Sequence, residues 1–178
     1  MTHLSEESVV TLINERKNTL RSLYLDGESL SDQTFKHLFL CQKLEELGIS
    51  FAEDMDELGV DAISKLHNLR ILKLKRAKKV VADDFISLFA NRALKNLVQI
   101  DLSECVQIND EVIKTIAIGC PKLESIMLHW CWDIRDQGME FLIRYCNNIE
   151  KLFLLGVVLL TDEFLNEINQ HLPRVSYH

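Results

Sequence analysis

Five cysteines and the run His129-Trp130-Cys131 are the residues of this chain whose types and spacing could do chemistry. A cysteine beside a histidine can form a nucleophile with its base, and both residue types ligate zinc. Zinc needs four protein ligands, or three and a water, but the chain has no C-x-x-C pair and its six histidines are scattered. An odd number of cysteines also excludes a fully paired disulfide framework, so we expect reduced thiols in a cytoplasmic or nuclear protein.

A repeated leucine phrase determines where these cysteines lie. In this phrase a Leu or Ile is followed three residues later by a second one, and two residues further by a third. The phrase occurs six times, starting at Leu20, Leu44, Leu69, Leu97, Leu123 and Ile149. Because the starts are 24 to 28 residues apart, the pattern predicts a solenoid in which each repeat buries its apolar face only against its neighbours.

Apolar residues replace cysteine at the equivalent positions of other repeats. Three residues before each phrase stand Cys41, Leu66, Leu94, Cys120, Cys146 and Leu172, and eight residues after its first Leu stand Glu28, Ala52, Ala77, Cys105, Cys131 and Val157. The exchange predicts unreactive thiols buried as small apolar groups. Side chains alternate along a strand, so His129 should face outward while Cys131 turns inward. We therefore expect no catalytic residue, no metal site, no cofactor and no enzymatic activity.

Stacked repeats would also bring Cys105 near Cys131, and Cys120 near Cys146. Neighbouring strands are about 4.8 Å apart, so the distance alone does not exclude a disulfide. The reducing compartment argues against one.

Each repeat predicts a strand at the leucine phrase and a helix after it. The clearest helices are expected at residues 108–120, 134–146 and 160–172, the first capped by Asn109 or Asp110 and ended by Pro121. Strands joined by crossover helices are parallel, so strands should line the concave side of an arc and helices its convex side. Residues 4–17 look like the helix of an earlier repeat, and a seventh strand should start at Val175. We expect one domain over residues 1–178, with about six and a half repeats and a partial repeat at each end.

The fourth and fifth repeats carry the most specific motif. Residues 120–134 read C-P-x-L-x-x-I-x-L-x-x-C-x-x-I, with Asp136 following. This motif resembles the cysteine-containing leucine-rich repeat of F-box/leucine-rich-repeat proteins, the substrate receptors of cullin-based ubiquitin ligases. The resemblance implies a right-handed α/β leucine-rich-repeat solenoid, or horseshoe. It also implies that the repeats hold a protein substrate while a separate F-box recruits the ligase through a Skp-type adaptor.

The functional prediction is therefore a non-enzymatic protein-binding module that resembles the substrate-recognition repeats of an F-box/leucine-rich-repeat ubiquitin-ligase receptor. A Skp-type adaptor is expected only if an F-box lies outside this chain. The alternative is a stand-alone leucine-rich-repeat scaffold, inhibitor or assembly factor without a ubiquitin-ligase link. The net charge of −7 argues against nucleic-acid binding. No stretch reaches the roughly 18 apolar residues of a membrane helix, so no membrane partner is expected.

A protein partner should bind the concave face, which displays the third, fifth and seventh residues of each phrase. Apolar residues gather there in the last two repeats, beside His129 and Trp130. They are Met127, Phe153 and Leu155. Exposed contiguous apolar surface usually marks an interaction site, which Trp132 could extend. The alternative is that these residues are covered by an end cap or by self-association.

A basic cluster lies in the middle of the arc, at Lys73, Lys75, Arg76, Lys78 and Lys79. Such a cluster could bind an acidic or phosphorylated peptide on the same concave face. The alternative is a solvated surface whose charges pair with flanking carboxylates, of which Glu46, Asp101 and Glu104 are the nearest by repeat position.

Overall fold

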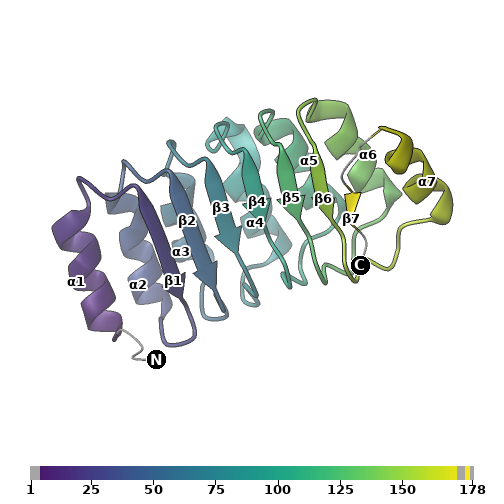
Figure 1. Ribbon diagram of the computed structural model, residues 1–178. Coiled ribbons are helices and arrows are strands. Elements are labelled where there is room, and N and C mark those ends of the chain that lie inside the picture. The colour runs from purple at the N-terminus through teal and green to yellow at the C-terminus, as the bar shows by residue number, and fades with distance from the viewer. Residues whose placement is uncertain (1–4, 172–174, 177–178) are drawn as a thin grey trace.

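Seven parallel strands form one open sheet, and helices cover one of its faces (Figure 1). The computed structural model describes residues 5–171 and 175–176. The strands are β1 (Ser22–Asp26), β2 (Glu46–Ser50), β3 (Ile71–Leu74), β4 (Gln99–Asp101), β5 (Ser125–Met127), β6 (Lys151–Phe153) and β7 (Val175–Ser176). They lie in sequence order, each hydrogen-bonded to the next. The predicted leucine-rich-repeat solenoid is confirmed, including the strand that starts at Val175.

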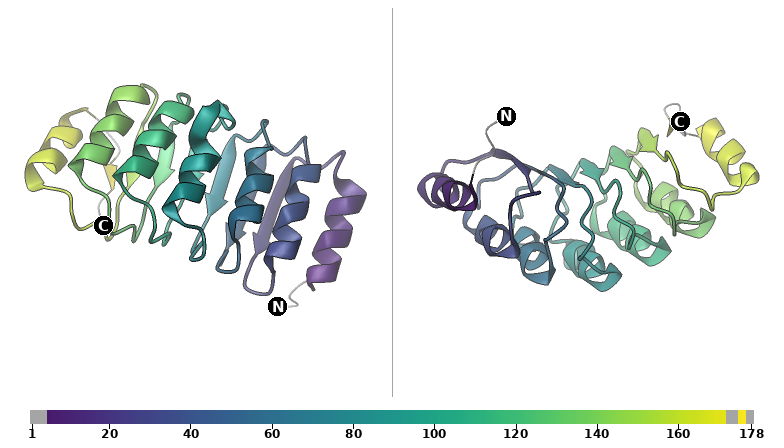
Figure 2. Two further views of the ribbon diagram at one scale, coloured as in Figure 1. Left: turned by 180° about the vertical axis from the view of Figure 1, so that it is seen from behind. Right: turned by 90° about the horizontal axis from the view of Figure 1, so that it is seen from below.

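The helices follow the strands in regular alternation. They are α1 (Glu6–Arg16), α2 (Asp32–Phe35), η1 (Lys36–Leu40), α3 (Glu57–Ser64), α4 (Ala82–Phe89), η2 (Ala90–Arg92), α5 (Asp110–Gly119), α6 (Asp136–Tyr145) and α7 (Asp162–His171). Figure 2 shows the strands on the inner side of the arc and the helices on the outer side, with the two ends of the chain far apart. Leu4 and Leu172, which were expected to lie in the helices at 4–17 and 160–172, lie outside the described residues.

The leucine phrases build the core column by column. The middle residue of each phrase pairs with its equivalent in the next strand, as Leu47 does with Leu72 and Ile126 with Leu152. Leu102 and Leu128, the last residues of their phrases, are completely buried, as expected. Each repeat thus buries its apolar side against two neighbours, which makes stability depend on the interfaces between repeats.

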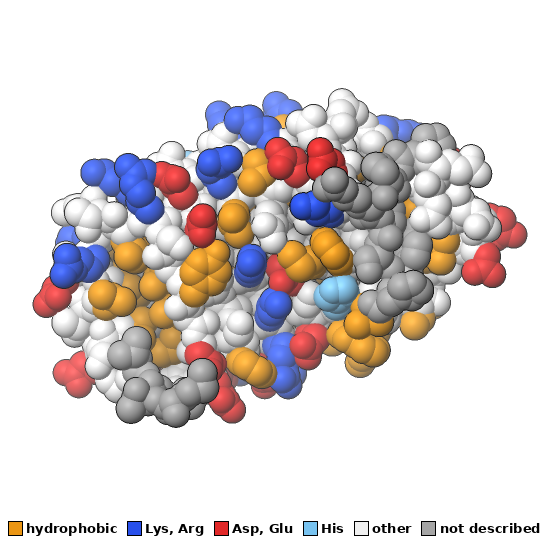
Figure 3. All heavy atoms as spheres, viewed as in Figure 1, with side chains coloured by type: hydrophobic (Ala, Val, Ile, Leu, Met, Phe, Trp, Pro, Cys, Tyr) orange, Lys and Arg blue, Asp and Glu red, His pale blue; other side chains and the backbone are white. Residues whose placement is uncertain are grey.

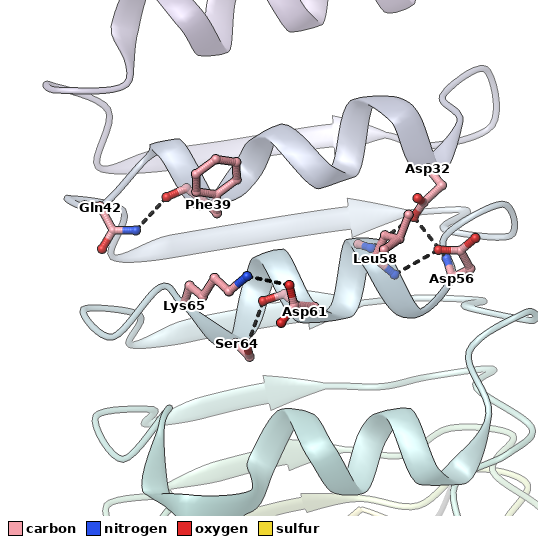
Figure 4. Close-up of polar contacts among 9 residues, drawn as sticks. Asp32, Phe39, Gln42, Asp56, Leu58, Asp61, Ser64 and Lys65 are labelled. Atoms are coloured by element: carbon pink, nitrogen blue, oxygen red, sulfur yellow. Dashed lines mark hydrogen bonds and ion pairs between the residues drawn. The ribbon is translucent and has the colours of Figure 1, made fainter.

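Carboxylates join the helix layer of one repeat to that of the next. Asp110, in the first turn of α5, accepts a hydrogen bond from the backbone N–H of Arg135 at 2.8 Å, and Asp136 accepts one from Thr161 at 2.9 Å. Asp32 of α2 does the same for Gly59 of α3 at 3.0 Å, and Figure 4 shows Asp32 beside Asp56 and Leu58 at the start of α3. Helix N-termini carry unpaired N–H groups, so these contacts satisfy donors that the next helix leaves open.

Within a single helix, Asn109 performs the capping role expected of it, since its side chain accepts from the N–H of Val112 at 3.1 Å. The helix it caps begins at Asp110 and ends at Gly119, two residues inside the start and one inside the end of the predicted range. This agreement reflects how strongly a cap and a following proline define a helix in the sequence.

Candidate functional site

The cysteines are buried, as the sequence predicts, and all five are free thiols. The Sγ atoms of Cys105 and Cys131 donate to the carbonyl oxygens of Leu74 and Leu102, at 3.2 and 3.3 Å. Burial raises the pKa of Cys105, Cys120 and Cys146 to about 12, and raises the pKa of Cys131 as well. A thiol with so high a pKa supplies no thiolate near neutral pH, so these groups pack rather than react.

His129 lies apart from the Cys131 thiol. Its Nδ1 accepts a hydrogen bond from the backbone N–H of Leu155 at 3.1 Å, while the Cys131 side chain turns into the core. Among the residues that the structure describes, no group of three or more His, Cys, Asp or Glu side chains could hold a metal ion. The histidine therefore serves to fix the loop that follows β6.

Apolar side chains line the floor of the concave face in the fifth and sixth repeats. Met127 of β5 pairs with Phe153 of β6, and both are half-buried. The His129 ring meets the Phe153 ring edge-on, with centroids 6.1 Å apart and planes at 69°. Leu155 follows, also half-buried. The predicted neighbours thus do lie together, but the last strand pairs with β6 and places the backbone of Ser176 beside Phe153.

A column of left-handed residues follows the strands along the C-terminal edge of the sheet. We number repeat positions from the first residue of each leucine phrase, so the column occupies position eight. Its members, with φ between 54° and 75°, are Phe51, Arg76, Glu104, Trp130 and Gly156. Bulky residues rarely adopt this conformation, which costs of order 1–2 kcal/mol each. Gly156 is the one glycine among these left-handed residues, and the Trp130 ring packs against it where a side chain would otherwise be.

Exposed apolar side chains continue from this column into the loops of the fifth and sixth repeats. We call them the C-terminal ledge: Trp130, Trp132, Val158 and Leu159. Their exposed fractions are 46%, 55%, 71% and 43%. Trp132 and Val158 occupy the same position of adjacent repeats, and the loops bridge in parallel at Arg135 and Leu159. Figure 3 shows one group of hydrophobic side chains beside the histidine toward this end of the molecule, and others elsewhere on the same face. The two tryptophans were expected at this surface, whereas Val158 and Leu159 were not.

Carboxylates neutralise most of the basic cluster. Lys75 pairs with Asp101 at 3.0 Å, and Arg76 pairs with Glu53 at 3.1 Å and with Glu104 at 3.5 Å. Glu53 also pairs with Lys78, at 2.9 Å, and Asp54 pairs with Lys79, at 2.6 Å. These four cations are therefore paired with carboxylates, mostly Glu53 and Asp54 rather than the expected Glu46. Lys73 differs, because its ammonium lies over the ring of Tyr24, 5.7 Å from the centroid.

Asp101 and Ser103 correct the predicted map of the concave face. Strand alternation placed both in water, yet they are only 1% and 5% exposed. Asp101 accepts hydrogen bonds from the hydroxyl and the backbone N–H of Ser103, at 2.6 and 3.1 Å, and Lys75 covers it from the solvent side. A local carboxylate–hydroxyl turn thus folds these side chains back onto the backbone, which alternation alone does not anticipate.

No helix within the described residues is long and apolar enough to cross a membrane. No known family profile matches the chain. Over 97% of its length it is 25% identical to F-box/LRR-repeat protein 4 of Bos taurus, and it spans 28% of that protein. Over 83% of its length it is 27% identical to BTB/POZ domain-containing protein FBL11 of Arabidopsis thaliana, of which it spans 16%.

Among solved structures, Rad7 in the yeast complex of Rad7 and Elc1 superposes with a TM-score of 0.79. The two are 22% identical, and the match covers 90% of this chain and 42% of that Rad7 chain. The repeats of this chain thus resemble the leucine-rich repeats of F-box/leucine-rich-repeat proteins, and they have the same solenoid fold. They correspond to less than a third of each curated relative named above.

Proposed function

We propose that this chain, one repeat domain over residues 1–178, is a non-enzymatic protein-binding module comparable to the substrate-recognition repeats of an F-box/leucine-rich-repeat ubiquitin-ligase receptor. The observation that carries the proposal is the C-terminal ledge. Two tryptophans there expose about half of their surface next to two further exposed apolar residues. Apolar surface that is both contiguous and exposed marks interaction sites, and tryptophan is the residue type most enriched at energetic hot spots.

The backbone at Trp130 supports the same conclusion. A left-handed conformation is unfavourable for tryptophan, but it turns the indole out of the sheet and onto Gly156. The ring is thereby held rigid while nearly half of it stays in water. A preorganised aromatic side chain loses little conformational entropy on binding, which favours its use as an anchor.

The surface we assign to the partner combines the ledge with the concave floor. It comprises Trp130 and Trp132, with Met127, His129, Phe153 and Leu155 beside them. Lys73, Lys75 and Arg76 lie further along the same face. Because most of these cations are already paired, we assign them to the rate of association rather than to affinity.

Linkage to a ubiquitin ligase requires a second surface. The solved Rad7 structure is a complex with Elc1, and the curated relatives extend far beyond the repeats. A Skp-type adaptor is proposed as a partner only if an F-box lies outside this chain. If this chain, expressed alone, bound such an adaptor in a pull-down, linkage would not need an outside F-box. If it did not, the stand-alone scaffold would remain the alternative.

Photo-crosslinking tests the binding surface. A benzophenone amino acid replaces Trp132 in one protein and Tyr145 in another; both side chains are exposed, but Tyr145 lies on α6 of the outer helical layer. We expect a specific adduct with a cellular protein from position 132 and none from position 145. An adduct formed equally from both positions, or from position 145 alone, would place the partner on another surface and overturn the assignment.

A further inference from the structure

Charged side chains line the edge of the sheet where the strands begin, and among the described residues only Arg21 and Glu45 of this edge pair with each other. We call position two of the repeats the N-terminal rim: Arg21, Glu45, Arg70, Val98, Glu124 and Glu150. The backbone N–H of each bonds the carbonyl oxygen of the one before, at 2.7 Å from Glu45 to Arg21 and from Arg70 to Glu45, and at 2.8 to 2.9 Å for the others. Six side chains thus project in register, with charges in the order plus, minus, plus, neutral, minus, minus.

A groove of about 640 Å³ runs along the first part of this rim. It is lined by Arg21, Lys43, Glu45, Asn68, Arg70, Asn96, Val98 and Lys122. Four of these are cations, and Glu45, the one carboxylate, contacts Arg21. Lys122 donates to the neutral amide oxygen of Asn96 at 2.9 Å. Within the described part of the chain, Lys43 and Arg70 form no ion pair.

A smaller pocket of about 230 Å³ continues from the groove and shares Val98 with it. Met127 and Phe153 supply apolar surface, and Glu124 and Glu150 line the pocket together with Lys151. Both glutamates are exposed, and neither pairs with a cation of the described residues. A cationic side chain with an aliphatic stem suits this pocket, because its stem can cover the methionine and phenylalanine while its head reaches the carboxylates.

We propose that the N-terminal rim binds an extended segment of a protein partner whose charges are ordered along its length. Carboxylates of that segment lie over Arg21, Lys43 and Arg70, an apolar residue lies over Val98, and a Lys or Arg enters the pocket between Glu124 and Glu150. This inference rests on the proposed function, since Met127 and Phe153 also belong to the partner surface. It adds the chemistry of the segment that the partner presents.

The spacing of the strands sets the spacing of the charges. Neighbouring strands lie about 4.8 Å apart and an extended chain rises about 3.3 Å per residue. Two strand intervals separate Arg70 from Glu124, and they correspond to roughly 10 Å or about three residues of the bound segment. The last acidic residue and the cation of the segment should therefore be three or four residues apart.

The lining favours a peptide over a nucleic acid. The groove has no aromatic side chain on which a base could stack, and sequence-tolerant binding of single strands depends on such stacking. Three carboxylates on the rim would also repel a continuous row of phosphates. Separated cations, interrupted by Glu45, match separated carboxylates better than they match a single dianionic phosphate.

Binding of two synthetic peptides to the full chain tests the proposal. Both are fluorescein-labelled, about ten residues long, and identical in composition. In the ordered peptide an acidic half is followed by Leu and, three or four residues after the last acid, by Arg. In the control peptide the charges alternate. By fluorescence anisotropy at about 50 mM salt we expect the ordered peptide to bind at least about tenfold more tightly.

Charge reversal on the protein identifies the surface. Arg70→Glu and Glu124→Lys should each lower the affinity for the ordered peptide by about tenfold. The Arg70→Glu variant should bind more tightly to a version of the ordered peptide in which Lys replaces the last acidic residue. Arg144→Glu makes the same charge change on the exposed outer side of α6 and should leave the affinity unchanged.

Equal affinity for both peptides would reduce the effect to net charge and overturn the proposal. Tighter binding of a single-stranded oligonucleotide, or of a phosphoserine version of the alternating peptide, would overturn it in favour of a phosphate ligand. The crosslink from position 132 reports on the proposed function separately, so it would persist if the rim alone were wrong.

Discussion

The left-handed column differs between the two halves of the solenoid. In the second to fourth repeats its side chains contact one another: the Arg76 guanidinium lies over the Phe51 ring at 5.0 Å and pairs with Glu104 at 3.5 Å. In the fifth and sixth repeats the column holds only Trp130 and Gly156, and the indole remains nearly half exposed. The same left-handed backbone conformation thus presents side chains that contact one another in one half and an exposed apolar side chain in the other.

The difference shows why a count of charges misjudges a binding surface. The five cations at 73–79 stand out in the sequence, yet four of them pair with carboxylates from neighbouring repeats. Exposed pairs of this kind contribute little to stability, but each already supplies a counter-charge that a ligand would have to replace. Exposed tryptophan has no such internal partner, so its burial is available to a complex.

The halves should differ only on their surfaces, which core truncation can test. Leu74 and Leu128 occupy the same repeat position in the two halves and both are completely buried. Leu74→Ala and Leu128→Ala should each lower the free energy of unfolding by about 2–5 kcal/mol, from lost burial and the cavity left behind. Urea denaturation measures both. A loss from one variant several times that from the other would show that the halves differ in packing as well.

Trp130→Ala should weaken partner binding by about 2 kcal/mol or more, since the indole is the most exposed rigid anchor of the left-handed column. Arg76→Ala is the matched change at the same repeat position in the other half. It should lose less affinity and act mainly on the association rate and its salt dependence. Surface plasmon resonance with the crosslinked partner measures both parameters. If both variants lost the same affinity, the contrast between the halves would not extend to binding.

Sequence periodicity predicted the solenoid because every repeat must bury apolar residues at the same positions. The leucine phrases, the cap at Asn109 and the stop at Pro121 are local, and each determines its own element. The neutralisation of the basic cluster was less visible, because Glu53 and Asp54 lie outside the strand positions from which the concave face was mapped. Buried Asp101 was missed for a related reason, since its turn with Ser103 overrides strand alternation.

The N-terminal rim could have been found in the sequence by comparing position two across repeats. That position holds Arg21, Glu45 and Arg70 in the first three repeats and two glutamates in the last two. What the sequence could not provide is that Arg70 forms no ion pair with another described residue, and that groove and pocket join at Val98. Both depend on how the loops of neighbouring repeats stack.

Buried thiols should make the protein less stable in alkali, because their pKa is raised on folding. For Cys105 the pKa rises from 9.0 to about 12. A thiol with a raised folded pKa contributes stability that is present below pH 9 and is lost as pH rises toward 12. Between pH 8 and pH 10 the loss from this thiol is about 1.4 kcal/mol. Cys105→Ala should remove that share of the pH dependence. Alanine suits this position, because Ala52 and Ala77 occupy it in two other repeats.

Urea unfolding at pH 8 and pH 10 compares this variant with Val157→Ala. Val157 holds the same repeat position without a thiol, so its truncation should lower stability equally at both pH values. If Cys105→Ala kept the full alkaline loss of the wild type, the thiol would not be the titrating group. Such a result would also contradict the conclusion that burial raises the pKa of Cys105 and thereby makes this thiol unreactive.

The smallest expected effect concerns backbone strain in the left-handed column. Glu104 has a φ of 62°, a conformation that glycine adopts freely and alanine does not. Glu104→Gly and Glu104→Ala both remove the contact with Arg76, so any difference between them comes from the backbone. We expect the glycine variant to be more stable by about 1 kcal/mol.

Glu111, on the exposed side of helix α5, provides the control, because there glycine should be less stable than alanine by about the same amount. An unfolding series in urea that ranked glycine below alanine at both positions would mean that the left-handed column is not strained. The sixth repeat, which already carries Gly156 at this position, would then differ from its neighbours for reasons other than backbone conformation.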